Sequence, residues 1–182
     1  MTQNPMLFEF SIVASGVDQT AADYESRFYD HGCEDALVSF QKGRTIVDFG
    51  REALSIEDAI ASAVDDVRRA GATVERVEPD PLVNLAEIAK RSDSTRAAIT
   101  NYAQGKRQCV QPFPSPVARV TTSSPLYDWG QVSHWMCVSG LIAREIAIEA
   151  RAVHEANQLV ACGATIQAEL SRRMAAYRAT IG

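Results

Sequence analysis

The sequence predicts an α+β protein, and three observations support that class. Apolar residues make up 46% of the 182 residues, which is enough for a packed core. Residues 7–77 alternate strand-length apolar runs with helical patterns, and residues 140–181 carry apolar side chains at helical spacing. Pro79 and Pro81 mark a short linker after the first of these stretches. We therefore expect three regions, covering residues 1–79, 80–138 and 139–182.

The first region has the predicted order strand, helix, strand, strand, helix, strand. Residues 7–13 alternate at period two, as in a half-buried strand. Tyr24 and Phe28 share a helical face, in a helix that Thr20 can cap and Gly32 can end. The remaining strands are expected at residues 36–41, 45–49 and 73–77, and a turn at residues 42–44 joins the first two.

The second helix of this region is the best specified element. Ser55 is a good N-cap, and Asp58 stands where a capping box places its acidic partner. Gly71 can close the helix. The apolar stripe comprises Ile56, Ala59, Ile60, Ala63, Val64 and Val67.

This β-α-β-β-α-β order predicts a ferredoxin-like split βαβ arrangement for residues 1–79. The fold hosts many functions and indicates none by itself. An oligomerisation or partner-docking module is favoured over a small-ligand sensor. No glycine-rich phosphate loop follows the first strand, where Ser15-Gly16-Val17-Asp18 contains a single glycine.

Two short helices joined by a polar turn are predicted in residues 85–104. Asn84 can cap the first, and Ser94 or Asp93 the second. In the second helix, the spacing turns Ile99, Tyr102 and Ala103 inward. It turns outward Arg96, Ala97, Thr100, Asn101 and Gln104, the positions from which a recognition helix reads the major groove.

The following segment predicts a wing. Gly105 ends the second helix, and Lys106 and Arg107 follow it directly. Residues 113–117 predict an extended strand, and residues 119–124 a turn and return strand. A short helix then begins near Trp129 and covers the core with Val132, Trp135 and Met136.

These motifs resemble AlpA-like and MerR-like winged helix-turn-helix DNA-binding proteins, which occur among bacterial regulators and phage excisionases. The similarity covers residues 82–136, in the order Leu85-Ala86-Glu87-Ile88-Ala89, Thr95-Arg96, Gly105-Lys106-Arg107, Phe113-Pro114-Ser115-Pro116-Val117 and Trp129 to Trp135. The sequence departs from the family pattern at three positions. Asp93 stands where a turn glycine is usual, Ser94 where a basic residue often stands, and Ala97 where a longer polar residue is frequent.

The resemblance implies a sequence-specific transcriptional regulator of double-stranded DNA. Base readout is expected from Thr95, Arg96, Thr100 and Asn101, and phosphate contacts from Lys106, Arg107 and Arg119. The full expected DNA-binding set is Ser94, Thr95, Arg96, Thr100, Asn101, Lys106, Arg107 and Arg119.

Charge supports the same segment. The net charge is −5, but residues 1–81 hold 7 basic and 16 acidic side chains, whereas residues 82–125 hold 6 and 2. The positive charge therefore collects where phosphates would be bound.

The last region carries a stripe that ends in Ile166, Leu170, Met174, Tyr177 and Ile181, close to a coiled-coil seam. It can pack on its own chain or form a dimer. We expect a homodimer, because readers of this type pair across two half-sites of an inverted repeat.

Other classes find less support. No apolar run reaches the roughly 20 residues needed to span a bilayer, and we find no secretory signal. We therefore expect a cytoplasmic protein that does not associate with a membrane. The four cysteines and three histidines do not have the spacing of a zinc site. We expect the cysteines to be free thiols without a functional role, and we expect no metal and no cofactor. No catalytic motif accompanies His31, His134 or His154, so an enzyme is not expected. The alternative is a protein-interaction adaptor or antitoxin-like protein that binds a partner through its acidic N-terminal domain.

Overall fold

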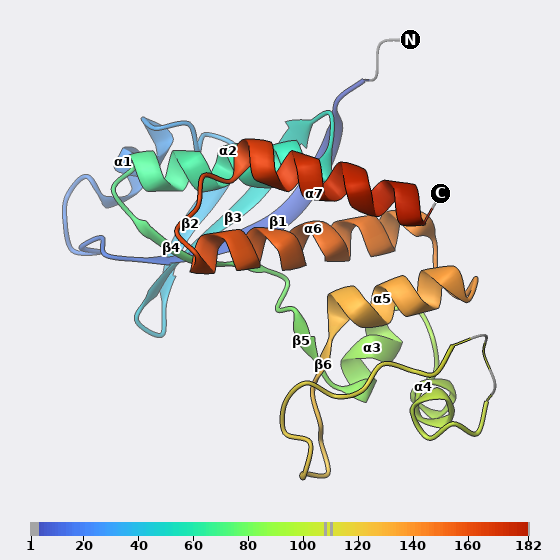
Figure 1. Cartoon of the computed structure of the whole chain (residues 1–182). Helices are drawn as coiled ribbons and strands as arrows, with labels where there is room; N and C mark the ends of the chain where they lie inside the picture. Colours follow the sequence, from blue (N-terminus) through green and yellow to red (C-terminus); the bar gives the residue numbers. More distant parts are fainter. Residues whose placement is uncertain (1–3, 108, 110, 182) are drawn as a thin grey trace. The chain divides into compact units, whose positions relative to one another are not determined.

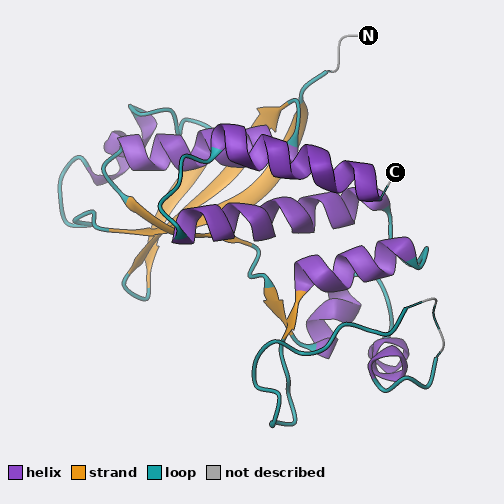
Figure 2. Cartoon of the chain, in the orientation of Figure 1, coloured by secondary structure: helices purple, strands orange, loops and turns teal. Residues whose placement is uncertain are grey.

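The computed structural model describes residues 4–107, 109 and 111–181, and it confirms the α+β class (Figure 1 and Figure 2). The chain forms two compact units. Unit 1 contains the residues up to Pro79 together with Glu155–Ala175, and unit 2 contains Asp80–His154 and the residues from Ala176 onward. Residues 139–182 are therefore shared between the two units and do not form a third one.

Unit 1 is built on a four-stranded antiparallel sheet with the strand order β2-β3-β1-β4. The helix α2 packs on one face of it, where alternate residues such as Phe10 and Phe49 are buried and stack at 5.4 Å. The elements are β1 (Met6–Ser15), α1 (Tyr24–Tyr29), β2 (Ala36–Gln41), β3 (Arg44–Ala53), α2 (Ile56–Arg69) and β4 (Thr73–Glu78).

Most of these helices and strands lie where the residue patterns of the sequence predicted them. Ser55 caps α2 as predicted, and its hydroxyl oxygen accepts a hydrogen bond from the Asp58 N–H. The prediction for the first helix was wrong at its start, because Thr20 bonds Asp18 and Asp23 occupies the N-cap position of a six-residue α1. The strand β3 continues to Ala53, beyond the predicted end at residue 49.

The two edges of this sheet differ. The side-chain amide of Asn157, on helix α6 (Arg144–Ala161), donates to the Val77 carbonyl and accepts from the Val77 N–H, as a neighbouring strand would. This amide satisfies the outward backbone groups of Val77 on the free side of β4. The other edge is β2, whose Leu37 is 70% exposed and whose Phe40 is 41% exposed.

The C-terminal stripe is buried within the single chain. Ile166, Leu170 and Met174 are fully buried, the last two on helix α7 (Gln167–Thr180). The preference for a dimer through this seam was wrong, because its apolar side chains are already covered in the monomer.

Unit 2 is mainly helical. Its core brings together Val83, Ile88, Ile99, Tyr102, Tyr127, Trp129, Val132, Trp135 and Met136. The elements wholly within it are β5 (Leu82–Val83), α3 (Leu85–Arg91), α4 (Arg96–Ala103), β6 (Tyr127–Asp128) and α5 (Trp129–Val138). Figure 1 looks along the axis of α4 and shows α5 from the side, so these two helices cross.

Candidate nucleic-acid interface

The turn between α3 and α4 is closed by backbone hydrogen bonds. Asn84 caps α3 as predicted, and Glu87 bonds back to the Asn84 N–H in a complete capping box. At the other end the Ser94 N–H donates to the Ala89 carbonyl, and Asp93 adopts a φ of 50°. This Schellman geometry needs a residue in the left-handed region, which glycine adopts most readily, and here Asp93 adopts it.

The helix α4 begins one residue later than expected. Thr95 is its N-cap, and the Thr95 hydroxyl oxygen accepts from the Ala98 N–H at 3.2 Å. The prediction that Ser94 or Asp93 would cap α4 was wrong, because both residues serve the preceding turn. The inner face of α4 is as predicted: Ile99 and Tyr102 are buried, and the Tyr102 ring meets the Trp135 ring edge-on at 5.2 Å.

The outer face of α4 is polar and free of negative charge. Arg96 and Asn101 are exposed one turn and a half apart, and Gln104 is exposed beyond them. Thr100 is half-buried, and its hydroxyl donates to the Arg96 carbonyl at 2.8 Å. Arg96 and Asn101 are therefore exposed polar side chains without an intrahelical side-chain hydrogen bond among the described residues, whereas the Thr95 and Thr100 hydroxyls bond within their own helix.

The end of α4 presents two cations. Gly105 has a φ of 67°, and the Lys106 N–H closes a second Schellman turn on the Asn101 carbonyl. Lys106 and Arg107 are exposed, and the Arg107 guanidinium lies 5.2 Å from the centre of the Tyr102 ring. The turn that ends α4 thus presents both cations at the C-terminal end of the helix.

The loop of residues 111–126 differs from the predicted wing. Residues 113–117 and 119–124 form no strands, and the pairing is one bridge between Ala118 and Leu126. Proline has no N–H to donate to a ladder, and three prolines stand at residues 112, 114 and 116. The strand pair of unit 2 is β5 with β6 instead.

An aromatic anchor holds this 111–126 loop in place. The Phe113 ring packs edge-on against Tyr127 at 5.6 Å and Trp135 at 5.0 Å. The Trp135 Nε1–H also donates to the Gln111 carbonyl. The tip beyond the bridge is exposed and polar, and it begins with Arg119 at a φ of 50°.

The Asp128 side chain, at the end of β6, contacts both α5 and α6. One carboxylate oxygen caps α5 by accepting from the Gln131 N–H at 2.8 Å, and the other lies 2.9 Å from Nδ1 of His154 on α6. Burial raises the pKa of Asp128, but the hydrogen bonds from His154 and Gln131 outweigh it and hold the pKa below its ordinary value. Asp128 is therefore a structural carboxylate that is ionised at neutral pH.

Nothing in the sequence indicated that the Arg91 side chain would be half-buried, unlike the exposed Lys106 and Arg107. Its guanidinium lies 5.7 Å from the Trp129 ring centre, and among the described residues its buried Nη1 has no hydrogen-bond partner. Burial lowers the pKa of Arg91, against the opposing charges of Glu87 and Asp80. Gln104, in contrast, could have been included in the predicted DNA-binding set, because its helical position places it on the outer face with Asn101.

The eight expected residues lie in one stretch of the chain without acidic side chains. From residue 94 to residue 127 the sequence contains no Asp or Glu, and it contains Arg96, Lys106, Arg107 and Arg119. Of the eight, Ser94 and Thr100 are half-buried and the other six are exposed. A surface of this kind can bind a polyanion through its cations and distinguish bases through its amide and guanidinium groups.

Other kinds of site were sought in the described part of the chain. No cluster of His, Cys, Asp and Glu there has the geometry to hold a metal ion, and no helix there is long and apolar enough to cross a membrane. Cys33 is buried, Cys109 and Cys137 are half-buried and Cys162 is exposed, and none is in a disulfide. Comparisons with protein-family models, curated proteins and solved structures found no match to this chain.

Proposed function

We propose that the protein is a sequence-specific DNA-binding regulator, in which unit 2 is a helix-turn-helix domain. The observation that carries the proposal is the outer face of α4. It offers Arg96, Asn101 and Gln104 to solvent, with Lys106 and Arg107 directly after it. Arginine pairs with guanine and asparagine with adenine in the major groove. The 111–126 loop, with Arg119 at its tip, takes the place of the wing.

Unit 1 supports a ferredoxin-like assignment in this proposal. Its βαββαβ element order and its strand order β2-β3-β1-β4 are those of the split βαβ arrangement. The arrangement carries no chemistry by itself. Its place in the proposal is to pair two chains, so that two copies of α4 can meet an inverted repeat.

Selection of bound sequences from a random duplex pool tests the proposal directly. A recovered motif with two half-sites in inverted orientation is expected, centred about 10 base pairs or a multiple of that apart. The affinity for the motif should fall steeply between about 50 and 200 mM salt, because phosphate contacts release counterions. Recovery of no motif, or affinity that salt leaves unchanged, would overturn the proposal.

Two substitutions separate base readout from phosphate contact. Arg96→Ala should cost about 1–3 kcal/mol on the preferred sequence and relax the preference at one position of each half-site. Lys106→Ala should weaken all sequences alike and reduce the salt slope by about 1. Arg172→Ala is the matched control, because it removes the same charge from an exposed position of unit 1. Equal effects of all three variants would show that only net charge matters.

A further inference from the structure

The free edge of β2 differs from what a monomeric protein usually presents. The strand Ala36–Gln41 carries no charge and no proline, although natural proteins protect free edges with such residues. On the opposite edge strand, β4, the Asn157 amide occupies the outward backbone groups of Val77, whereas β2 has no such side chain bonded to Val38 or Phe40 among the described residues. A strand that pairs there would meet unbonded backbone groups.

The hairpin register fixes which backbone groups face outward. The turn at Lys42 and Gly43 has φ values of 50° and 80°, the geometry of a two-residue hairpin, and Gln41 pairs with Arg44. The Gly50 N–H donates to the Asp35 carbonyl, so the odd residues of β2 bond to β3. The N–H and C=O groups of Val38 and Phe40 therefore point away from the sheet.

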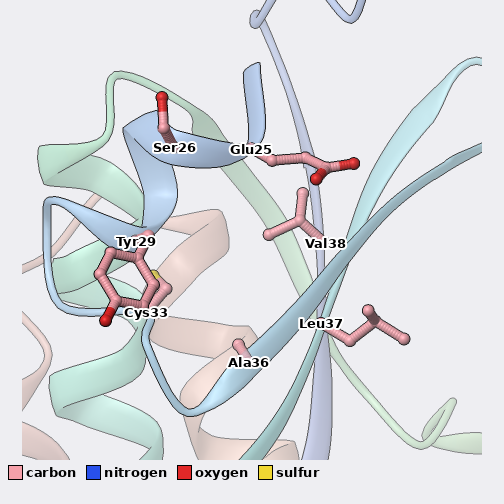
Figure 3. A pocket seen from close by; sticks show the side chains of 7 residues that line it. All are labelled: Glu25, Ser26, Tyr29, Cys33, Ala36, Leu37 and Val38. Atoms are coloured by element: carbon pink, nitrogen blue, oxygen red, sulfur yellow. The ribbon is translucent and has the colours of Figure 1, made fainter. Parts of the chain in front are cut away.

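A hollow lies beside this edge (Figure 3). It has a volume of about 360 Å³ and lies between α1 and β2. The figure shows Val38 on the α1 side of the strand and Leu37 turned away from it. The lining residues are Glu25, Ser26, Tyr29, Cys33, Ala36, Leu37 and Val38.

We infer that β2 pairs with β2 of a second copy of this chain, in antiparallel orientation about a two-fold axis at Val38. In that register each Val38 N–H donates to the partner's Val38 carbonyl, and Phe40 lies opposite the partner's Ala36. The Phe40 N–H donates to the Ala36 carbonyl, because the Ala36 N–H is already bonded to Cys33. Two four-stranded sheets become one continuous sheet.

Shape and charge both fit this register. Alanine is the small partner that Phe40 needs, and the hollow beside Ala36 is larger than the roughly 150 Å³ that accommodates a benzene ring. Lys42 comes to lie opposite the partner's Glu34. Both are exposed, and neither has an ion pair elsewhere in the described residues. Because a two-fold pairing uses the β2 edge of both copies, the assembly closes at two copies.

Sedimentation of the full chain without DNA tests the interface. The wild-type protein should be a dimer at tens of micromolar, and Phe40→Ala should weaken the dimer roughly tenfold or more. Glu34→Lys and Lys42→Glu should each weaken it about tenfold, because both symmetric pairs become repulsive. Mixing the two single variants should restore the dimer, since every pair in the mixed dimer is again opposite in charge.

The control for charge is Glu52→Lys, an exposed site on β3 that should leave the dimer unchanged. Circular dichroism checks that each variant is folded. A monomer at about 100 μM, or a dimer unaffected by both single charge changes, overturns the inference and leaves β2 to another protein.

The inference rests on the proposed function only for its purpose. A dimer that selects no DNA would refute the proposed function alone, whereas a monomer that still selects a DNA sequence would refute the interface and the pairing role of unit 1 but not DNA recognition by unit 2.

Discussion

Replacement of Asp128 should destabilise unit 2, because this carboxylate caps α5 and pairs with His154 at the same time. Loss of an N-cap costs about 1 kcal/mol. A hydrogen bond to a charged group contributes about 1.5–3 kcal/mol, and the Asp128 and His154 side chains are 12% and 19% exposed, so we take about 2 kcal/mol for this contact. Asp128→Ala should therefore lose about 3 kcal/mol of the free energy of unfolding.

Asp128→Asn separates the two contributions. Asparagine caps helices about as well as aspartate, so this variant should keep the α5 cap and lose about 2 kcal/mol. Urea unfolding followed by tryptophan fluorescence measures both variants within unit 2, because the two tryptophans of the chain are Trp129 and Trp135. If Asp128→Asn unfolds at the wild-type urea concentration, the argument from the Asp128–His154 contact is refuted.

The pH dependence has a definite sign. The pKa of Asp128 is lowered in the folded protein, so its contribution is complete above the unfolded pKa of about 3.9 and is lost as the pH falls through the lower folded pKa. The difference in stability between wild type and Asp128→Asn should therefore be full at neutral pH and vanish in acid. A difference that does not begin to decrease once the pH falls below the unfolded pKa of about 3.9 would contradict this assignment.

Three further predictions concern other positions. Phe113→Ala should cost about 2 kcal/mol and speed proteolysis within the 111–126 loop, whereas Val120→Ala, at a 62% exposed site, should change neither. Gly130→Ala should lower the melting temperature, although alanine favours helices by about 1 kcal/mol over glycine. The new Cβ would lie 3.1 Å from Oδ1 of Asp128 and 3.2 Å from Cβ of His154, which is too close. Burial and nearby carboxylates raise the pKa of Cys33 to about 12, so iodoacetamide at about pH 8 should alkylate the exposed Cys162 first and reach Cys33 only on unfolding, as mass spectrometry would show.

The sequence predicted those elements whose ends are fixed by neighbouring residues. Ser55 with Asp58, and Asn84 with Glu87, are caps that two side chains specify within four positions. The β2–β3 turn is likewise set by Lys42-Gly43, which together adopt the positive φ values of a tight hairpin.

Prediction failed where several neighbours could serve equally well or where distant packing decides. Asp93, Ser94 and Thr95 are all competent caps, and only the backbone turn at Asp93 selects Thr95 for α4. The periodicity of Leu170 and Met174 is the same whether the stripe packs in the monomer or between two chains. The loss of strand structure at residues 113–117 could have been inferred from its alternating prolines.

The candidate site was predictable in part for the same reason. Helical spacing sufficed to place Arg96 and Asn101 on the outer face of α4. It could not show that the Thr95 and Thr100 hydroxyls bond within their own helix, because those bonds depend on where the helix begins and which rotamers it permits.

The division of the chain between the two units has a consequence for its synthesis. Unit 1 begins with β1 but is completed by Glu155–Ala175, and unit 2 requires the residues from Ala176 onward. Neither unit is a continuous stretch that could finish folding while the next is being translated. A chain whose synthesis stalls before residue 155 would therefore lack Glu155–Ala175 of unit 1 and the residues of unit 2 from Ala176 onward. We expect premature termination anywhere upstream of α7 to yield a polypeptide that is cleared by proteolysis, with no half-protein that functions alone.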